Sequence, residues 1–168
     1  CDPEWNGHEF FEASSIRKIN GKYYFVYSAY DGHELCYATS DSPMGPFKFG
    51  GTIVSNGDVG LNGREKKNAC YPIGNNHGGI ACLPNGKFYI FYHRHSNFTN
   101  TDRQGLAEEI KIEEDGSIKQ VEMTSCGLNG GPLEGKGEYP ASICCCLMPK
   151  EGNVFYNFFR WPWQKGKM

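Results

Sequence analysis

The sequence predicts an all-β fold built from two four-stranded antiparallel sheets, arranged as neighbouring blades of a β-propeller. Three observations carry this prediction. The 168 residues include 22 Gly, 10 Tyr and 11 Phe, a composition typical of short strands joined by tight turns. The chain contains an internal repeat of strand and turn signals. No segment shows a helical hydrophobic period, and Ile110 and Ile112 alternate in strand fashion.

The repeat is clearest at two hairpins, SIRKINGKYYFVYS (15–28) and IACLPNGKFYIFYH (80–93). Both contain Asn-Gly-Lys followed by an aromatic residue and Tyr, and Asn20 corresponds to Asn85, an offset of 65 residues. Asn-Gly favours a tight hairpin turn because Gly accepts positive φ. Each unit therefore begins with a strand, a turn and a second strand.

Two further strands are expected in each unit. The four segments are HELCYATSD (33–41), FKFGGTIVS (47–55), RQGLAEEIKI (103–112) and SIKQVEM (117–123). A unit of about 65 residues with four strands is what one propeller blade requires, so we expect blades at 8–56 and 75–124. A β-sandwich is the alternative, but it does not predict the repeat.

The domain organisation follows from these blades. Residues 1–140 are interpreted as a partial propeller domain and residues 141–168 as an irregular tail without an assigned function. Two blades do not close a propeller, which needs roughly four to eight, and open blades expose sheet edges and apolar faces. We therefore expect either a piece that pairs with further blades of the same polypeptide or a chain that assembles with other copies, and the start at Cys1 without a Met favours the piece.

Charge and cysteine usage exclude several classes of function. The net charge is −2 and the pI about 6.2, so no basic surface for nucleic acid or an anionic membrane is expected. No apolar run reaches the roughly 18 residues of a membrane-spanning helix. The eight Cys contain no CxxC pair, so we expect buried free thiols rather than a zinc knuckle. Either a secreted or a cytoplasmic location fits the sequence.

Two motifs, FFEASSIRK (10–18) and NHGG (76–79), resemble blades three and four of glycoside hydrolase family 43. The resemblance runs from about residue 2 to about 140 and implies a partial five-bladed propeller. It implies an enzyme that removes arabinose or xylose units from plant polysaccharides or oligosaccharides with inversion. Glu12 would be the general acid, while His77 and Arg103 would face the substrate pocket. Independently, Glu12 and His77 differ by the repeat offset of 65, so they occupy equivalent positions on the two inner strands.

Inversion requires a protonated acid and an ionised base about 6.5–9.5 Å apart. The resemblance implies that the base is an Asp on the first blade and that an Asp on the second blade tunes the acid. Asp2 matches neither motif, so we expect the isolated chain to be inactive. The rival hypothesis is a non-catalytic carbohydrate-binding piece of a propeller, and a third is a structural β-domain.

Each candidate site residue also has an ordinary structural interpretation. A desolvated Glu12 would have a raised pKa, as a proton donor needs, but it could be a plain glutamate on an exposed strand face. His77 could contact substrate or lie near a central calcium ion, acting through water because calcium prefers oxygen ligands. It could instead be a hydrogen-bonded core histidine. Arg103 could bind sugar hydroxyls or the acid, or lie on the surface. No cofactor is required, and calcium is possible.

Two further binding sites could be formed by an indole and by imidazole side chains. Trp5 could stack on a sugar, because it lies in the loop just before the acid strand. His93 and His95 lie on one face of a strand and could form a three-histidine metal site with His77. We favour the alternative that their strand packs inside the blade.

Overall fold

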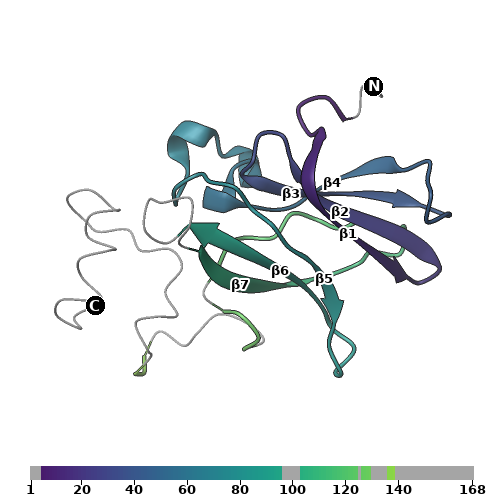
Figure 1. The fold of residues 1–168 in the computed structure, drawn as a ribbon. Coiled ribbons are helices and arrows are strands. Elements are labelled where there is room, and N and C mark those ends of the chain that lie inside the picture. Colours follow the sequence, from purple (N-terminus) through teal and green to yellow (C-terminus); the bar gives the residue numbers. More distant parts are fainter. Residues whose placement is uncertain (1–4, 96–102, 125, 130–135, 139–168) are drawn as a thin grey trace.

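The computed structural model describes residues 5–95, 103–124, 126–129 and 136–138. Within them the chain forms two antiparallel sheets, seen as separate layers in Figure 1, with short 3-10 helices at η2 (Asn56–Asp58), η3 (Leu61–Gly63) and η4 (Lys66–Asn68). The all-β prediction is confirmed. The predicted tail at 141–168 lies outside the described residues. Among the residues the structure describes, no helix has the length and apolarity needed to cross a membrane.

The first sheet contains four strands in the order β1-β2-β3-β4, as the sequence predicts. They are β1 (Phe10–Ile19), β2 (Lys22–Ala29), β3 (Glu34–Ser40) and β4 (Lys48–Ser55). The turn between β1 and β2 needs left-handed backbone at both of its residues, with φ of 49° at Asn20 and 85° at Gly21. Asn and Gly tolerate this region best, which explains why the Asn-Gly signal identified the hairpin correctly.

The second sheet has three strands, so the prediction of a fourth strand at 117–123 is wrong. It contains β5 (Gly79–Cys82), β6 (Phe88–His95) and β7 (Arg103–Ile110). After one isolated bridge between Ile112 and Ile118, the chain returns to the first sheet.

The backbone N–H groups of the returning segment explain the error, because they bond to groups of the first blade and its following loop. Ile118 donates to the Tyr37 hydroxyl at 2.8 Å and Val121 to the Ile53 carbonyl at 2.8 Å. Met123 donates to Asp58 Oδ1 at 2.7 Å. Figure 1 shows this green segment running back past the first sheet.

The core lies between the two sheets. The first sheet contributes buried Tyr24, Val26, Leu35, Tyr37 and Ile53, and the second contributes Ile80, Ile90, Tyr92 and Ile110. Removal of these side chains from water is the main force that holds the sheets together. β5 lies against β1 and β2, so the first strands of the two blades are neighbours, as they are around a propeller axis.

Two glycines of the NHGG motif permit this close packing. A Cβ on Gly78 would lie 1.9 Å from the Phe91 carbonyl oxygen, and a Cβ on Gly79 would lie 2.7 Å from Ser15 Oγ. Both distances are far below van der Waals contact, so any side chain here would push β5 away from β6 or from β1.

Tyr37→Phe tests whether the returning segment is fastened to the first sheet. The variant leaves the buried Ile118 N–H without its acceptor, which costs about 1–3 kcal/mol of stability. Urea unfolding of the full chain should show the loss as a lower midpoint. Tyr30→Phe is the matched control, because Tyr30 is 75% exposed. Equal midpoints for the two variants would contradict this account.

Candidate active site

Glu12 lies on an irregular stretch near the start of β1. The register of β1 against β2 shifts both between Phe10 and Glu12 and between Glu12 and Ser15. Ala13, in the middle, has a φ of 60°, which is rare for a residue with a Cβ. Such bulges redirect side chains and are common beside functional sites. The direction of the Glu12 side chain, 44% exposed, is therefore set by the bulge.

The structure brings Glu12 and His77 together. Nε2 of His77 lies 2.8 Å from Oε1 of Glu12, so the two side chains share a hydrogen bond between the first and second blades. His77 is 31% exposed and directly precedes the two glycines that let β5 approach β1. The contact joins residues separated by the repeat offset of 65, the relation from which the sequence predicted their equivalence.

His93 holds the backbone of His77. The His77 N–H donates to Nδ1 of His93 at 3.3 Å, and Nε2 of His93 lies 3.0 Å from Oδ1 of Asn75. Because Nδ1 accepts a hydrogen bond, the proton of a neutral ring must lie on Nε2 and be donated to Asn75. Burial, followed by the positive charge of Arg103, lowers the pKa of His93 to about 4. His93 is therefore neutral at neutral pH.

Arg103 lies at the first position of β7, where it pairs with His95 of β6. Its influence on His93 shows that its charge lies close to the histidines. The structure thus links Glu12 to His77 and His77 to His93, and the charge of Arg103 acts on His93. Their roles toward a substrate remain predictions.

The histidines converge on an asparagine. Nε2 of His95 lies 2.7 Å from Oδ1 of Asn75, the same atom that His93 contacts. Nε2 of His93 and Nε2 of His95 are thus both directed at this amide oxygen. The described residues therefore give no support to a metal site formed by His77, His93 and His95. Asn75 is itself held by Asn56, whose Nδ2 donates to the Asn75 carbonyl at 3.2 Å. Sequence reasoning missed both asparagines, although Asn75 lies two residues before His77.

Trp5 lies against the first sheet. Its ring stacks on Tyr27 with centroids 5.6 Å apart and tilts against Phe49 at 5.9 Å. One face of the indole is therefore covered, and a sugar could stack only on the opposite face. The prediction that Trp5 binds a sugar remains a prediction.

His77 lies two residues before β5, so the prediction that it lies on the inner strand itself is wrong, although it does face Glu12 of β1. Two neighbouring blades with a carboxylate and an imidazole in contact where their first strands meet fit a propeller-type glycosidase. Residues 2–118 match the sequence profile of Glycosyl hydrolases family 43, and the chain belongs to this family. The resemblance of the motifs at 10–18 and 76–79 to glycoside hydrolase family 43 is thereby confirmed.

Curated relatives agree with this assignment. A xylosidase/arabinosidase of Thermoclostridium stercorarium is 56% identical over 152 residues, which cover 90% of this chain and 32% of that protein. A beta-xylosidase of Xylanibacter ruminicola is 37% identical over 123 residues, 71% of this chain and 33% of that protein. The chain thus spans about a third of the length of these relatives.

Solved structures share the fold. A family 43 β-xylosidase/α-arabinofuranosidase from a compost microbial metagenome, in complex with xylotriose and in a calcium-free form, is 35% identical with a TM-score of 0.54. The match covers 67% of this chain and 30% of that one. A family 43 enzyme of Xanthomonas citri complexed with xylose is 31% identical with a TM-score of 0.54, over 68% of this chain and 30% of that one.

His93→Gln tests the neutral state of His93. Between its ordinary pKa of 6.5 and about 4, the unfolded chain binds a proton here that the folded protein does not. The free energy of unfolding therefore falls as the pH is lowered through this range. Glutamine keeps an acceptor for His77 and a donor for Asn75 but does not titrate. Urea unfolding at several pH values should show a shallower fall for the variant, and an unchanged slope would contradict the assignment.

Proposed function

We propose that this chain is part of a glycoside hydrolase that removes arabinose or xylose units from plant polysaccharides or oligosaccharides with inversion, and that Glu12 is its general acid. The observation that carries the proposal is the contact between Glu12, on β1 of the first blade, and His77, in the segment just before β5 of the second blade. The names of the relatives, xylosidase/arabinosidase and beta-xylosidase, support the substrate class.

The geometry of Glu12 suits proton delivery to a leaving group. His77 binds Oε1, and Oε2 has no hydrogen-bond partner among the described residues. A protonated Oε2 can therefore donate to the glycosidic oxygen while His77 holds the rest of the carboxyl group in position. This proton makes the departing sugar a neutral alcohol rather than an alkoxide, which lowers the barrier to bond cleavage.

The remaining site residues have supporting parts in this proposal. His77 orients the acid, and the His93 ring in turn holds the His77 backbone. Arg103, at the exposed start of β7, can donate forked hydrogen bonds to sugar hydroxyls. The face of the Trp5 ring that points away from Tyr27 would stack on a sugar ring.

Inversion also needs an ionised base, which activates a water on the opposite face of the sugar. We propose that this base and a second, acid-tuning aspartate come from other blades of the longer polypeptide, and that the isolated chain is inactive. Calcium remains possible beside His77. Calcium needs several oxygen ligands, but the carboxylate beside His77 is Glu12 itself, and Oδ1 of Asn75 already accepts hydrogen bonds from two histidines. Direct binding of calcium by these residues therefore fits poorly. Such an ion would be held through water, and no step depends on it.

A chimaera tests the catalytic role of Glu12. This chain would replace the matching segment of the Thermoclostridium stercorarium xylosidase/arabinosidase, which supplies the rest of the propeller. The chimaera should hydrolyse nitrophenyl xyloside or arabinofuranoside. Glu12→Gln should lower kcat by about 10²–10⁴-fold, with a larger loss on xylobiose, whose leaving group depends more on protonation. Glu114→Gln, an exposed carboxylate in a turn, is the control.

The possible results separate the hypotheses. Full activity of Glu12→Gln would remove Glu12 from the mechanism. A folded chimaera that binds xylo-oligosaccharides without cleaving them would favour the non-catalytic rival.

A further inference from the structure

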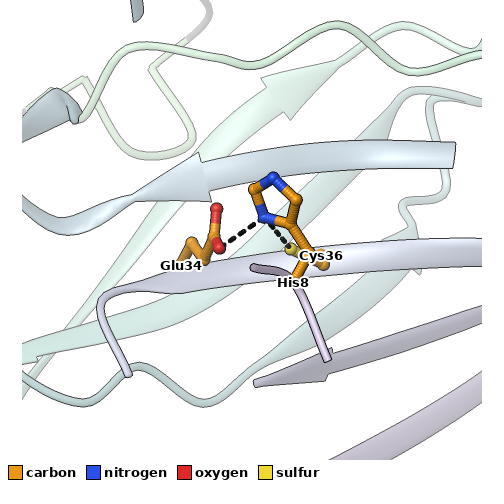
Figure 2. Close-up of side chains that lie close together, drawn as sticks. All are labelled: His8, Glu34 and Cys36. Carbon is orange, nitrogen blue, oxygen red and sulfur yellow. Dashed lines mark hydrogen bonds and ion pairs between the residues drawn. The ribbon is translucent and has the colours of Figure 1, made fainter. Parts of the chain in front are cut away.

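Three side chains on the opposite face of the first sheet form a second polar cluster. His8 comes from the loop before β1, while Glu34 and Cys36 are alternate residues of β3 and so point to the same side. Nδ1 of His8 lies 2.6 Å from Oε1 of Glu34 and 3.8 Å from Sγ of Cys36. Figure 2 shows the imidazole, carboxylate and thiol directed at one point. Their three ligand atoms all lie within 4.8 Å of one another.

We propose that His8, Glu34 and Cys36 bind a divalent metal ion of borderline softness, Zn²⁺ being the best fit. One imidazole nitrogen, one carboxylate oxygen and one sulfur are ligands that zinc accepts together. Calcium and magnesium demand mainly oxygen ligands, of which the cluster has too few. Of the residues the structure describes, these three are the group of His, Cys, Asp and Glu whose ligand atoms meet this closely.

The two distances from His8 can be compared with those around a tetrahedral ion. Bonds of about 2.0 Å to nitrogen and about 2.3 Å to sulfur hold these two atoms roughly 3.5 Å apart, close to the 3.8 Å between His8 and Cys36. The contact between His8 and Glu34 must widen by roughly 0.7 Å to admit a metal. The His8 side chain is 37% exposed and can rotate by this amount, whereas Glu34 is 6% exposed.

A second layer of contacts orients the cluster. The Thr52 hydroxyl donates to Oε2 of Glu34 at 2.7 Å and lies 3.7 Å from Sγ of Cys36. The His8 ring stacks on Phe49 at 5.0 Å, and the Tyr27 hydroxyl donates to the His8 carbonyl at 2.7 Å. Outer contacts of this kind orient the ligands of metal sites.

Zinc binds cysteine as the thiolate, so metal binding would displace the Cys36 proton and place a cation between two buried anionic ligands. Three protein ligands leave a fourth position for water.

The bound ion would tie the loop at 5–9 to β3. That loop leads directly into β1, two residues before Glu12. The predicted role of the metal is thus structural: it would fix the start of the strand that carries Glu12. The inference is independent of the proposed reaction, because it concerns the other face of the sheet.

Cobalt titration of the full chain tests the site, because Co²⁺ replaces zinc and reports thiolate ligation by an absorption band in the near ultraviolet. The background should have the four cysteines outside the described residues replaced by Ser, so that they cannot bind cobalt. This background should bind one Co²⁺ with the thiolate band, and excess Zn²⁺ should abolish the band. Cys36→Ser should remove it and weaken Zn²⁺ binding at least about tenfold.

Two further variants guard against misfolding as the cause of a lost signal. His8→Gln alters a partly exposed loop residue and should weaken Zn²⁺ binding while circular dichroism stays unchanged. Cys82→Ser removes an exposed thiol outside the cluster and should keep both the band and the affinity. Zn²⁺ should raise Tm in the background and in Cys82→Ser, but not in the other two variants. Absence of a thiolate band in the background, or equal Zn²⁺ affinity in all variants, would overturn the proposal.

Discussion

The close approach of β5 to β1 is the constraint on which the candidate site depends. A Cβ at Gly79 would crowd the Ser15 hydroxyl of β1, and a Cβ at Gly78 would overlap the Phe91 carbonyl of β6, so both glycines favour this close packing. This approach brings His77 to Glu12, with 2.8 Å between nitrogen and oxygen. The NHGG motif thus contains both the glycines that permit close packing and the histidine that contacts Glu12, because His77 directly precedes Gly78 and Gly79.

Contacts on two sides position the start of β1, the strand that carries Glu12. Inside the pair of blades, His77 holds the carboxyl group and His93 holds His77. On the other side, the loop before β1 is held by the Tyr27 hydroxyl, which donates to the His8 carbonyl, and by the Tyr30 N–H, which donates to the Glu9 carbonyl. A metal ion at His8 would strengthen this second support. The two polar clusters therefore act on the start of β1 from opposite faces of the sheet.

The two faces of the first sheet differ in how completely they are buried. The face toward the second sheet is closed by a continuous aliphatic and tyrosine core. The opposite face carries a second cluster with Trp5, Phe25, Phe47 and Phe49 only partly buried, and Phe10 is 49% exposed. A large open aromatic face is unusual for a finished surface. It agrees with the expectation of further blades and with relatives about three times as long.

The sequence alone predicted the seven strands found in the described residues and the equivalence of two positions, because turn residues and alternation act locally and the repeat fixes an offset. Asn-Gly identified the first hairpin, and the offset of 65 paired Glu12 with His77. Only the tertiary structure determined the position of residues 117–123. Their N–H groups could bond either to β7, as a fourth strand, or to acceptors on the first blade, and the sequence does not distinguish these partners. The tertiary structure also determines the bulge at Ala13, the hydrogen bonds from two histidines to Asn75 and the cluster of His8, Glu34 and Cys36. Each depends on contacts between segments far apart in the chain, which no local pattern encodes.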